Sequence, residues 1–336
     1  MPDRLRGPRR GVAWCQPQRR KGVASQIVLQ NQPKQSMSSQ AHHLNLDPKT
    51  FKECLNREPF GFTHNLSGLG LFDMDSLRSL AKRYDKNGNY FVAAGASAPG
   101  AKFYSAPRIS ERPSDVFDKL NEGSYRILLK RVDRQDERFR KLLELQFQQI
   151  MDLKGGLGDD RVERLESGVF ISSSATTTPF HFDPEVNFFS QIAGEKTYHV
   201  YSPSAVTEEE LERFYFRGTV NIGQIDLAGR DPKSESVFKL GPGRGLQQPQ
   251  NAPHWVETGA GLSISYSFVY ETTATRVASR ARALNFYLRK VGLKPRRPGD
   301  RPRSDTAKAK AMGAAFGVVL PVRRAAGNLI RKVRGR

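Results

Sequence analysis

The chain carries the stretch Thr178-Pro179-Phe180-His181-Phe182-Asp183, and Pro253-His254-Trp255 follows later, with His254 placed 73 residues after His181. In a β-strand, residues two positions apart point to the same face of the sheet. His181 and Asp183 can therefore converge on one point if this stretch is a strand. His254 would reach the same point from a strand that is distant in the sequence but close in space.

Two histidines and one carboxylate in this pattern are the ligand set of non-haem Fe(II) oxygenases. Such a triad occupies one face of the ion and leaves the other positions open, which is what oxygen and a cosubstrate require. We therefore predict that His181, Asp183 and His254 form a metal site.

The residues after the His-x-Asp pair read as a strand from Asn187, a turn at Ala193-Gly194, and a second strand from Lys196 to Tyr201. Alternation along the first strand places Asn187, Phe189 and Gln191 on the face shared with His181 and Asp183.

The region around His254 has the same character. Gly241 to Gly245 is rich in turn residues, and Leu262 to Tyr270 alternates small polar with large apolar residues, as in a half-buried strand. Ser263, Ser265 and Ser267 share one face of that strand. Short strands separated by small turns predict a mainly β fold with flanking helices, a double-stranded β-helix of the cupin or jelly-roll form.

Helix signals flank the predicted barrel. Asp47-Pro48 is a cap followed by proline at the first helical position, and Thr207 to Glu210 has the pattern of a capping box. Apolar residues at helical spacing predict further helices over Asp73 to Tyr84 and from Phe139 to Ile150. Tyr125 to Lys130 reads as a strand.

The stretch TPFHFDPEVNFFSQIAGEKTYHVYSP, from Thr178 to Pro203, resembles the JmjC oxygenases. It is similar to the asparaginyl-hydroxylase type (factor inhibiting hypoxia-inducible factor) and to bacterial cupin-like JmjC proteins. The resemblance covers about Gly168 to Thr273. It implies that Thr178 and Lys196 hold the distal carboxylate of 2-oxoglutarate, since a dianion in a barrel interior needs a cationic partner.

The resemblance also implies polar support for the cosubstrate from Asn187 and Ser267. Ser267 stands where the asparaginyl hydroxylase carries an asparagine. In some relatives a tyrosine before the first ligand reaches the cosubstrate, and Tyr125 is the candidate for that role.

The activity implied is that of an Fe(II)- and 2-oxoglutarate-dependent dioxygenase, which hydroxylates its substrate, or demethylates it where the target carbon bears a heteroatom. The substrate stays open among a protein side chain, a tRNA base and a small molecule. The alternative is a non-catalytic cupin-like binding module with basic tails. Lys196 separates the two interpretations, because a module without 2-oxoglutarate has no need of a buried lysine there.

Positive charge is concentrated at the two ends of the chain. Residues 1–36 hold eight Lys or Arg and one Asp, residues 272–336 hold eighteen Lys or Arg and two Asp, and residues 37–271 then carry a net charge of −3 out of the total of +20. We expect the basic tails to contact nucleic acid or an acidic membrane surface electrostatically.

We expect five regions along the chain. They are a disordered basic extension (1–46), a mixed region packed on the barrel (47–160), the catalytic core (161–273), a C-terminal helix (274–294) and a basic tail (295–336). The resemblance implies a homodimer contact through the C-terminal helix. A chain spanning Ser38 to Lys294 is expected to fold, bind iron and turn over 2-oxoglutarate, but to lose most of its affinity for nucleic acid or acidic membranes. No transmembrane segment or secretory signal is evident, and a cytoplasmic location suits Fe(II) chemistry.

Overall fold

Two antiparallel sheets face each other in the computed structural model, which describes residues 43–95, 97–103, 109–173, 176–218 and 222–334. The large sheet has the strand order β1-β2-β10-β7-β12-β5-β4-β3, and the small sheet has the order β6-β11-β8-β9. The strands are β1 Leu44–Asn45, β2 Phe60–His64, β3 Tyr90–Ala94, β4 Tyr125–Lys130, β5 Val162–Ser172, β6 Thr177–Phe182, β7 Val186–Ala193, β8 Lys196–Tyr201, β9 Glu235–Leu240, β10 Arg244–Gln248, β11 Pro253–Thr258 and β12 Ser263–Thr272.

Strands β5 to β12 are shared between the sheets, four in each, and the chain crosses from one sheet to the other between most neighbouring strands. This is the predicted double-stranded β-helix. The turn expected at Ala193-Gly194 joins β7 to β8, and Gly194 adopts a left-handed φ of 68° there. A side chain at Gly194 would place its Cβ 2.3 Å from the carbonyl oxygen of Leu262, so only glycine fits.

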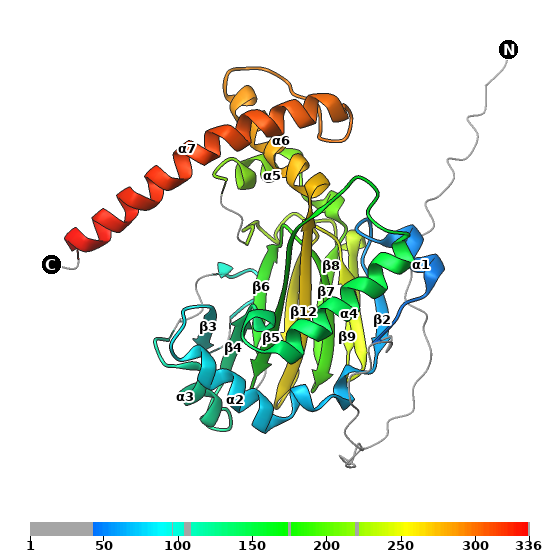
Figure 1. Cartoon of the computed structure of the whole chain (residues 1–336), viewed down its shortest axis with the longest axis vertical. Helices are drawn as coiled ribbons and strands as arrows, with labels where there is room; N and C mark the ends of the chain where they lie inside the picture. The colour runs from blue at the N-terminus through cyan, green and yellow to red at the C-terminus, as the bar shows by residue number, and fades with distance from the viewer. Residues whose placement is uncertain (1–42, 96, 104–108, 174–175, 219–221, 335–336) are drawn as a thin grey trace.

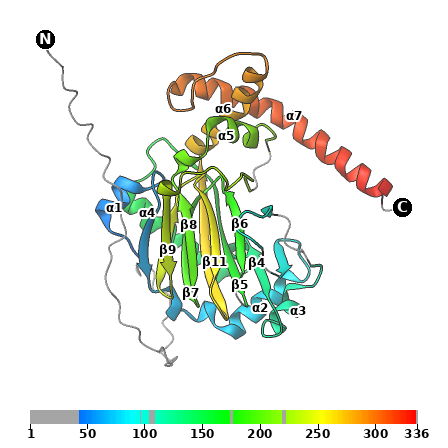
Figure 2. The same ribbon diagram turned by 180° about the vertical axis from the view of Figure 1, so that it is seen from behind.

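Alternation along the strands sorts their side chains into two cores. Phe188 joins the core between the large sheet and the helices, whereas Phe189 joins a second core between the two sheets together with Tyr198 and Leu246. The parity argument for β7 is therefore confirmed: the face that carries Phe189 looks into the barrel. Figure 2 shows the small sheet from its outer side, which no helix of the described residues crosses.

Helices cover the outer face of the large sheet and one end of the barrel (Figure 1). The predicted caps are present, because the Asp47 side chain accepts from the Thr50 amide and Thr207 forms a capping box with Glu210. The α-helices are α1 Pro48–Cys54, α2 Met74–Tyr84, α3 Pro113–Asp118, α4 Glu137–Lys154, α5 Glu208–Tyr215, α6 Thr273–Lys290 and α7 Pro302–Arg334.

The N-terminal part of the chain contributes to the large sheet itself. Strand β2 pairs with β10, and β4 pairs with β5, so residues before 161 extend the barrel sheet at both edges. Residues 43–46 were expected in the disordered extension, but Leu44 and Leu46 are buried, and β1 pairs with β2. Gln149 of α4 bonds both the amide and the carbonyl of Leu44, which orders this segment. The rest of the extension lies outside the described residues.

Most of the segment expected as a basic tail, residues 295–336, forms one long helix. Helix α6 ends before Gly292, which has a φ of 83°, and α7 then runs unbroken from Pro302 to Arg334. Ala309 and Met312 of α7 are buried, because the first part of this helix packs on α6. Alanine at many positions of α7 also favours helix. In Figure 1 the remainder of α7 projects away from the barrel.

Candidate metal centre and anion pocket

The structure brings the three predicted ligands together at one end of the barrel. His181 on β6 and His254 on β11 are paired across the small sheet, and Asp183 directly follows β6. The Asp183 Oδ2 atom lies 3.9 Å from His181 Nε2 and 3.7 Å from His254 Nε2. One ligand atom from each residue falls within 4.8 Å of the others. Two imidazole nitrogens and one carboxylate oxygen at this spacing fit a divalent transition metal.

Backbone carbonyls set the orientation of both imidazole rings. His181 Nδ1 lies 2.7 Å from the Pro179 carbonyl oxygen, and His254 Nδ1 lies 3.1 Å from the Ala252 carbonyl oxygen. Each Nδ1–H therefore donates to a carbonyl, and each Nε2 keeps its lone pair turned toward Asp183.

Burial keeps both imidazoles neutral. It lowers the pKa of His254 to about 3, helped by the neighbouring His181, and it lowers the pKa of His181 as well. Neutral imidazole is the form that binds metal. Asp183 is the more exposed member of the triad, with a side chain that is 25% exposed, so the centre opens on the Asp183 side.

A β-bulge brings Thr178 to the same face as His181. His181 pairs with His254 and Thr178 pairs with Val256, so three steps along β6 match two steps along β11. Without the bulge, residues three apart would point to opposite faces. The Thr178 hydroxyl instead faces the interior, where it accepts a hydrogen bond of 3.1 Å from the Arg126 guanidinium.

Lys196, at the start of β8, is buried in the same interior. Its ammonium donates a hydrogen bond of 3.0 Å to the hydroxyl of Thr258. Burial, together with the charge of Arg126, lowers the pKa of Lys196 to about 7. Neither cation forms an ion pair with a carboxylate of the described residues, and the buried Arg126 Nε has no hydrogen-bond partner among them. Two buried cations without a counter-ion are an incomplete site that an anion would complete.

The remaining predicted residues also face the barrel interior. Asn187 is paired with Gln248 on β10, and the Asn187 Oδ1 atom is buried without a partner among the described residues. Ser267 is paired with Phe189 and is 5% exposed. The hydroxyls of Ser263 and Ser265 both form hydrogen bonds with the side-chain amide of Gln191, so each already has a polar partner.

Arg126 and Thr258 were missed by the sequence reasoning, which considered Tyr125 instead. Alternation on β4 turns Tyr125 toward the helix-covered core with Ile127, and it turns Arg126 into the barrel. An arginine directly before the apolar run Ile127 to Leu129 was the available signal. It could be used only once β4 was known to pair with β5.

Two segments border the metal centre. The ring of Phe103 lies 4.6 Å from the His181 ring, and the Phe103 amide donates to Gln224 Oε1 at 3.3 Å. Gln224 also lines a cavity of about 520 Å³ between α5 and the outer side of β6, together with Phe182, Arg213 and Phe214. The cavity and the metal centre thus lie on opposite sides of the same strand.

No protein-family model matches the chain. Lysine-specific demethylase 8 from Xenopus tropicalis is 29% identical over 141 residues, which cover 36% of this chain and 30% of that protein. JmjC domain-containing protein D from Dictyostelium discoideum is 27% identical over 128 residues, which cover 34% of this chain and 28% of that protein. The chain thus spans less than a third of the length of these curated relatives. These matches confirm the resemblance to JmjC proteins for about a third of the chain.

Among solved structures, two of YcfD, a ribosomal oxygenase from Escherichia coli, align with TM-scores of 0.45 and 0.47. Each is 17% identical and covers 82% of this chain, with 67% and 69% of YcfD covered. Another structure of that enzyme is a complex with cobalt and 2-oxoglutarate. The similarity is distant.

Proposed function

We propose that the chain is an Fe(II)- and 2-oxoglutarate-dependent oxygenase of the JmjC type. The observation that carries this proposal is that two incomplete sites share one barrel interior. One is a cluster of two neutral imidazoles and one carboxylate, and the other is a pair of buried cations without a counter-ion. A metal would complete the first site, and the distal carboxylate of the cosubstrate would complete the second.

His181, Asp183 and His254 would hold Fe(II) through Nε2, a carboxylate oxygen and Nε2. When bound, the iron supplies the oxidative chemistry that amino-acid side chains cannot perform. The Pro179 and Ala252 carbonyls keep the two imidazoles in the required tautomer, and Asp183 contributes the only negative charge.

Lys196, Thr178 and Arg126 would hold the distal carboxylate of 2-oxoglutarate. The Arg126 guanidinium adds a second positive charge and a fixed planar set of donors to the predicted lysine–threonine pair. Asn187 and Ser267 would offer polar contacts nearer the metal, since the Asn187 amide oxygen is otherwise unpartnered among the described residues.

The alternative is a non-catalytic module that binds an anion in the same pocket. The metal cluster favours the enzyme, because a module that binds only an anion gains nothing from two buried imidazoles kept neutral beside a carboxylate. The two proposals differ in one measurement. Succinate formation from 2-oxoglutarate, with Fe(II) and without added substrate, is expected for the enzyme and absent for the module.

The substrate stays open among a protein side chain, a tRNA base and a small molecule. Addition of each class to the same assay should reveal it, because a true substrate raises the rate of succinate formation above the basal rate. The product also distinguishes hydroxylation from demethylation, since demethylation releases formaldehyde.

We further propose that the C-terminal helices carry the polyanion contact expected from the charge distribution. Lys290, Lys294 and Arg301 lie in a region that is mostly solvent-exposed. Three other arginines of this region, Arg282, Arg289 and Arg297, are paired with glutamates of α5, so less charge is free than the sequence suggested. Salt titrations of RNA and anionic-vesicle binding test this contact.

A homodimer contact through α6 also remains a proposal. Three apolar side chains at its end, Tyr287, Val291 and Leu293, are 43%, 73% and 56% exposed. Light scattering on the intact chain and on Val291→Glu would test whether this surface joins two copies. No helix in the described part of the chain is both long and apolar enough to span a bilayer. A cytoplasmic location is proposed from the suitability of a reducing compartment for Fe(II).

A further inference from the structure

A buried hydrogen bond links helix α5 to the turn before the third metal ligand. The hydroxyl of Tyr215, the last residue of α5, donates to Asn251 Oδ1 at 2.6 Å. Both side chains are buried, with Tyr215 3% and Asn251 5% exposed. Burial raises the pKa of Tyr215 to about 12, so the phenol remains a donor at neutral pH.

The turn that carries Asn251 contacts two of the three metal ligands. The backbone N–H of Asn251 donates a hydrogen bond of 2.8 Å to the backbone carbonyl of Asp183. The next residue, Ala252, supplies the carbonyl that orients the His254 ring. One short turn therefore fixes the backbone beneath Asp183 and the rotation of His254 at the same time.

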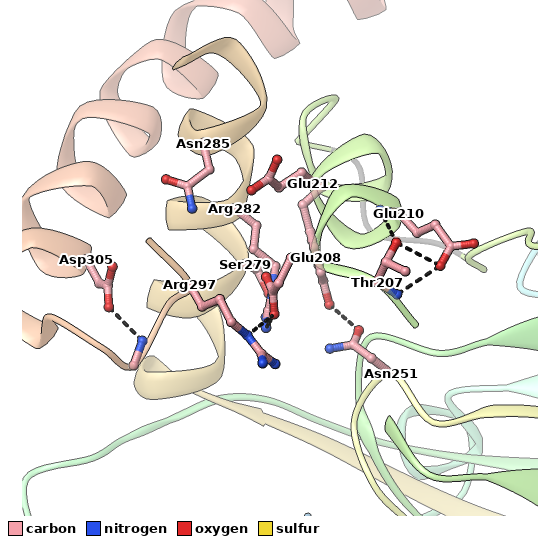
Figure 3. A network of polar contacts seen from close by, with 12 residues as sticks. Thr207, Glu208, Glu210, Glu212, Asn251, Ser279, Arg282, Asn285, Arg297 and Asp305 are labelled. Atoms are coloured by element: carbon pink, nitrogen blue, oxygen red, sulfur yellow. Dashed lines mark hydrogen bonds and ion pairs between the residues drawn. The ribbon is translucent and has the colours of Figure 1, made fainter. Parts of the chain in front are cut away.

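Asn251 occupies an unusual conformation that suits this task. Its φ is 62°, in the left-handed region that glycine and asparagine tolerate best. This conformation lets the amide point toward Asp183 while the side chain points toward Tyr215. Figure 3 shows Asn251 at the barrel end of α5.

Helix α5 is itself held in place by α6. Glu208 pairs with Arg282 at 3.0 Å, and the buried Glu212 pairs with Arg289 at 2.7 Å. Figure 3 shows Glu208, Arg282 and Arg297 gathered between the two helices. Tyr215 also packs in one apolar cluster with Phe182, the residue between the first two ligands. The position of the phenol is therefore determined by packing and ion pairs on several sides.

We propose that Tyr215 and Asn251 are positioning residues for the metal centre, acting on Asp183 and His254 through the turn at residues 249–252. The inference rests on the proposed function only in that the triad binds a divalent metal. Neither residue is one of the three candidate ligands, and the proposal concerns the geometry of those ligands rather than their chemistry. Partners that orient metal ligands are commonly worth tenfold to a hundredfold in metal affinity.

The test measures Co(II) binding, because the visible absorption of Co(II) reports the geometry of its ligands. Tyr215→Phe removes only the hydroxyl, and Asn251→Gly removes the acceptor while tolerating the left-handed backbone. Tyr84→Phe is the matched control, since Tyr84 is also a buried tyrosine and its hydroxyl also donates a hydrogen bond of 2.6 Å, to the Lys130 carbonyl on β4, in the core between the large sheet and the helices.

We expect Tyr215→Phe and Asn251→Gly each to weaken Co(II) binding about tenfold or more and to alter the Co(II) spectrum. The double variant should be no weaker than the weaker single variant, because both changes remove the same bond. Tyr84→Phe should lower the melting temperature about as much as Tyr215→Phe does. It should leave the Co(II) affinity and the Co(II) spectrum unchanged.

Unchanged Co(II) affinity and spectrum in both Tyr215→Phe and Asn251→Gly would overturn the positioning role while leaving the proposed metal centre intact. An equal loss of affinity in Tyr84→Phe would also overturn it, because the effect would then be general loosening. If His181→Ala binds Co(II) as tightly as the unaltered chain, the assignment of the metal centre itself is wrong. That result is distinct from a failure of the positioning role.

Discussion

The Arg126 guanidinium on the large sheet donates a hydrogen bond of 3.1 Å to the Thr178 hydroxyl on the small sheet. This contact crosses the barrel interior and places a second cation beside Lys196. The pair has no counter-ion among the described residues, so the pocket is prepared for an anionic ligand before any ligand arrives.

Replacement of Lys196 by Met should weaken 2-oxoglutarate binding by about a hundredfold or more. Loss of one partner from a buried ion pair costs roughly 3–5 kcal/mol, and each 1.4 kcal/mol is about tenfold in affinity. Arg126→Met should act in the same direction, and Thr178→Val more weakly, because it removes one neutral group. Calorimetry in the presence of Mn(II) measures the affinity.

Lys239→Met is the control for that experiment. Lys239 lies on β9 of the same sheet, paired with Thr197, but on the outer face. It should leave the affinity unchanged. If Lys196→Met binds 2-oxoglutarate as tightly as the unaltered chain, the assignment of the anion pocket is wrong.

The affinity for 2-oxoglutarate should fall as pH rises above about 7. The pKa of Lys196 is lowered to about 7 by burial and by Arg126, so the ammonium is lost from the empty pocket above that pH. Because the anion binds the charged form, affinity should decline by up to about tenfold per pH unit beyond the pKa. His254, with a pKa of about 3, stays neutral from pH 6.5 to 8.5 and should not contribute.

Lys196→Arg provides the comparison, because a guanidinium keeps its charge throughout this range. The variant should bind with little dependence on pH. The same lowered pKa has a consequence for stability without ligand. The unfolded chain holds more protons than the folded chain between pH 7 and about 10, so the contribution of Lys196 to stability should rise with pH across that window. A pH-independent affinity in the unaltered chain would contradict this account.

Removal of a metal ligand should abolish metal binding and turnover while leaving the fold intact. His181→Ala and Asp183→Ala each leave two ligands, and Asp183→Ala also removes the only negative charge of the centre. Metal titration followed by Co(II) absorption measures the loss, and circular dichroism reports the fold. His199→Ala is the matched change, since His199 lies on β8 of the same small sheet and bonds to Glu235 on the outer face. Normal metal affinity in Asp183→Ala would refute the triad.

A chain that ends at Val318 should be as stable as the full chain, whereas one that ends at Lys294 should not. Met312 and Ala309 of α7 are 6% and 4% exposed, and Lys308 donates to the buried Asn285 of α6 at 2.8 Å. Met312→Ala alone should cost roughly 2–5 kcal/mol of stability. Thermal unfolding of the two shortened chains and of Met312→Ala tests this, and equal melting temperatures for all of them would show that α7 does not stabilise the barrel.

Local patterns in the sequence predicted the strands, the caps and the convergence of His181, Asp183 and His254, because each depends on residues that are close in the chain or on a strong ligand pattern. The expected capping box at Thr207 and the inward face of β7 are examples. What local patterns could not supply was pairing between distant strands. Arg126 enters the pocket only because β4 lies beside β5, and Thr258 reaches Lys196 only because β11 lies beside β8.

The C-terminal tail was misjudged for a similar reason. A stretch rich in alanine, glycine and basic residues has little apolar periodicity of its own, and the surface that buries Met312 comes from α5 and α6. Nothing in the sequence therefore indicated that truncation at Lys294 lowers stability. In the structure, truncation after the packed part of α7 keeps the contacts of this helix with α6.

The bulge in β6 has a consequence for how this protein's relatives can diverge. The bulge allows a threonine three positions before the first histidine to share that histidine's face. The interval of three residues between Thr178 and His181 therefore reflects the one extra residue in β6. A homologue that lost the extra residue would have a regular β6, and its threonine, then two positions before the first histidine, would still share that histidine's face. Among relatives, a threonine two positions before the histidine on a regular strand is therefore equivalent in facing to Thr178, which lies three positions before it on a bulged strand.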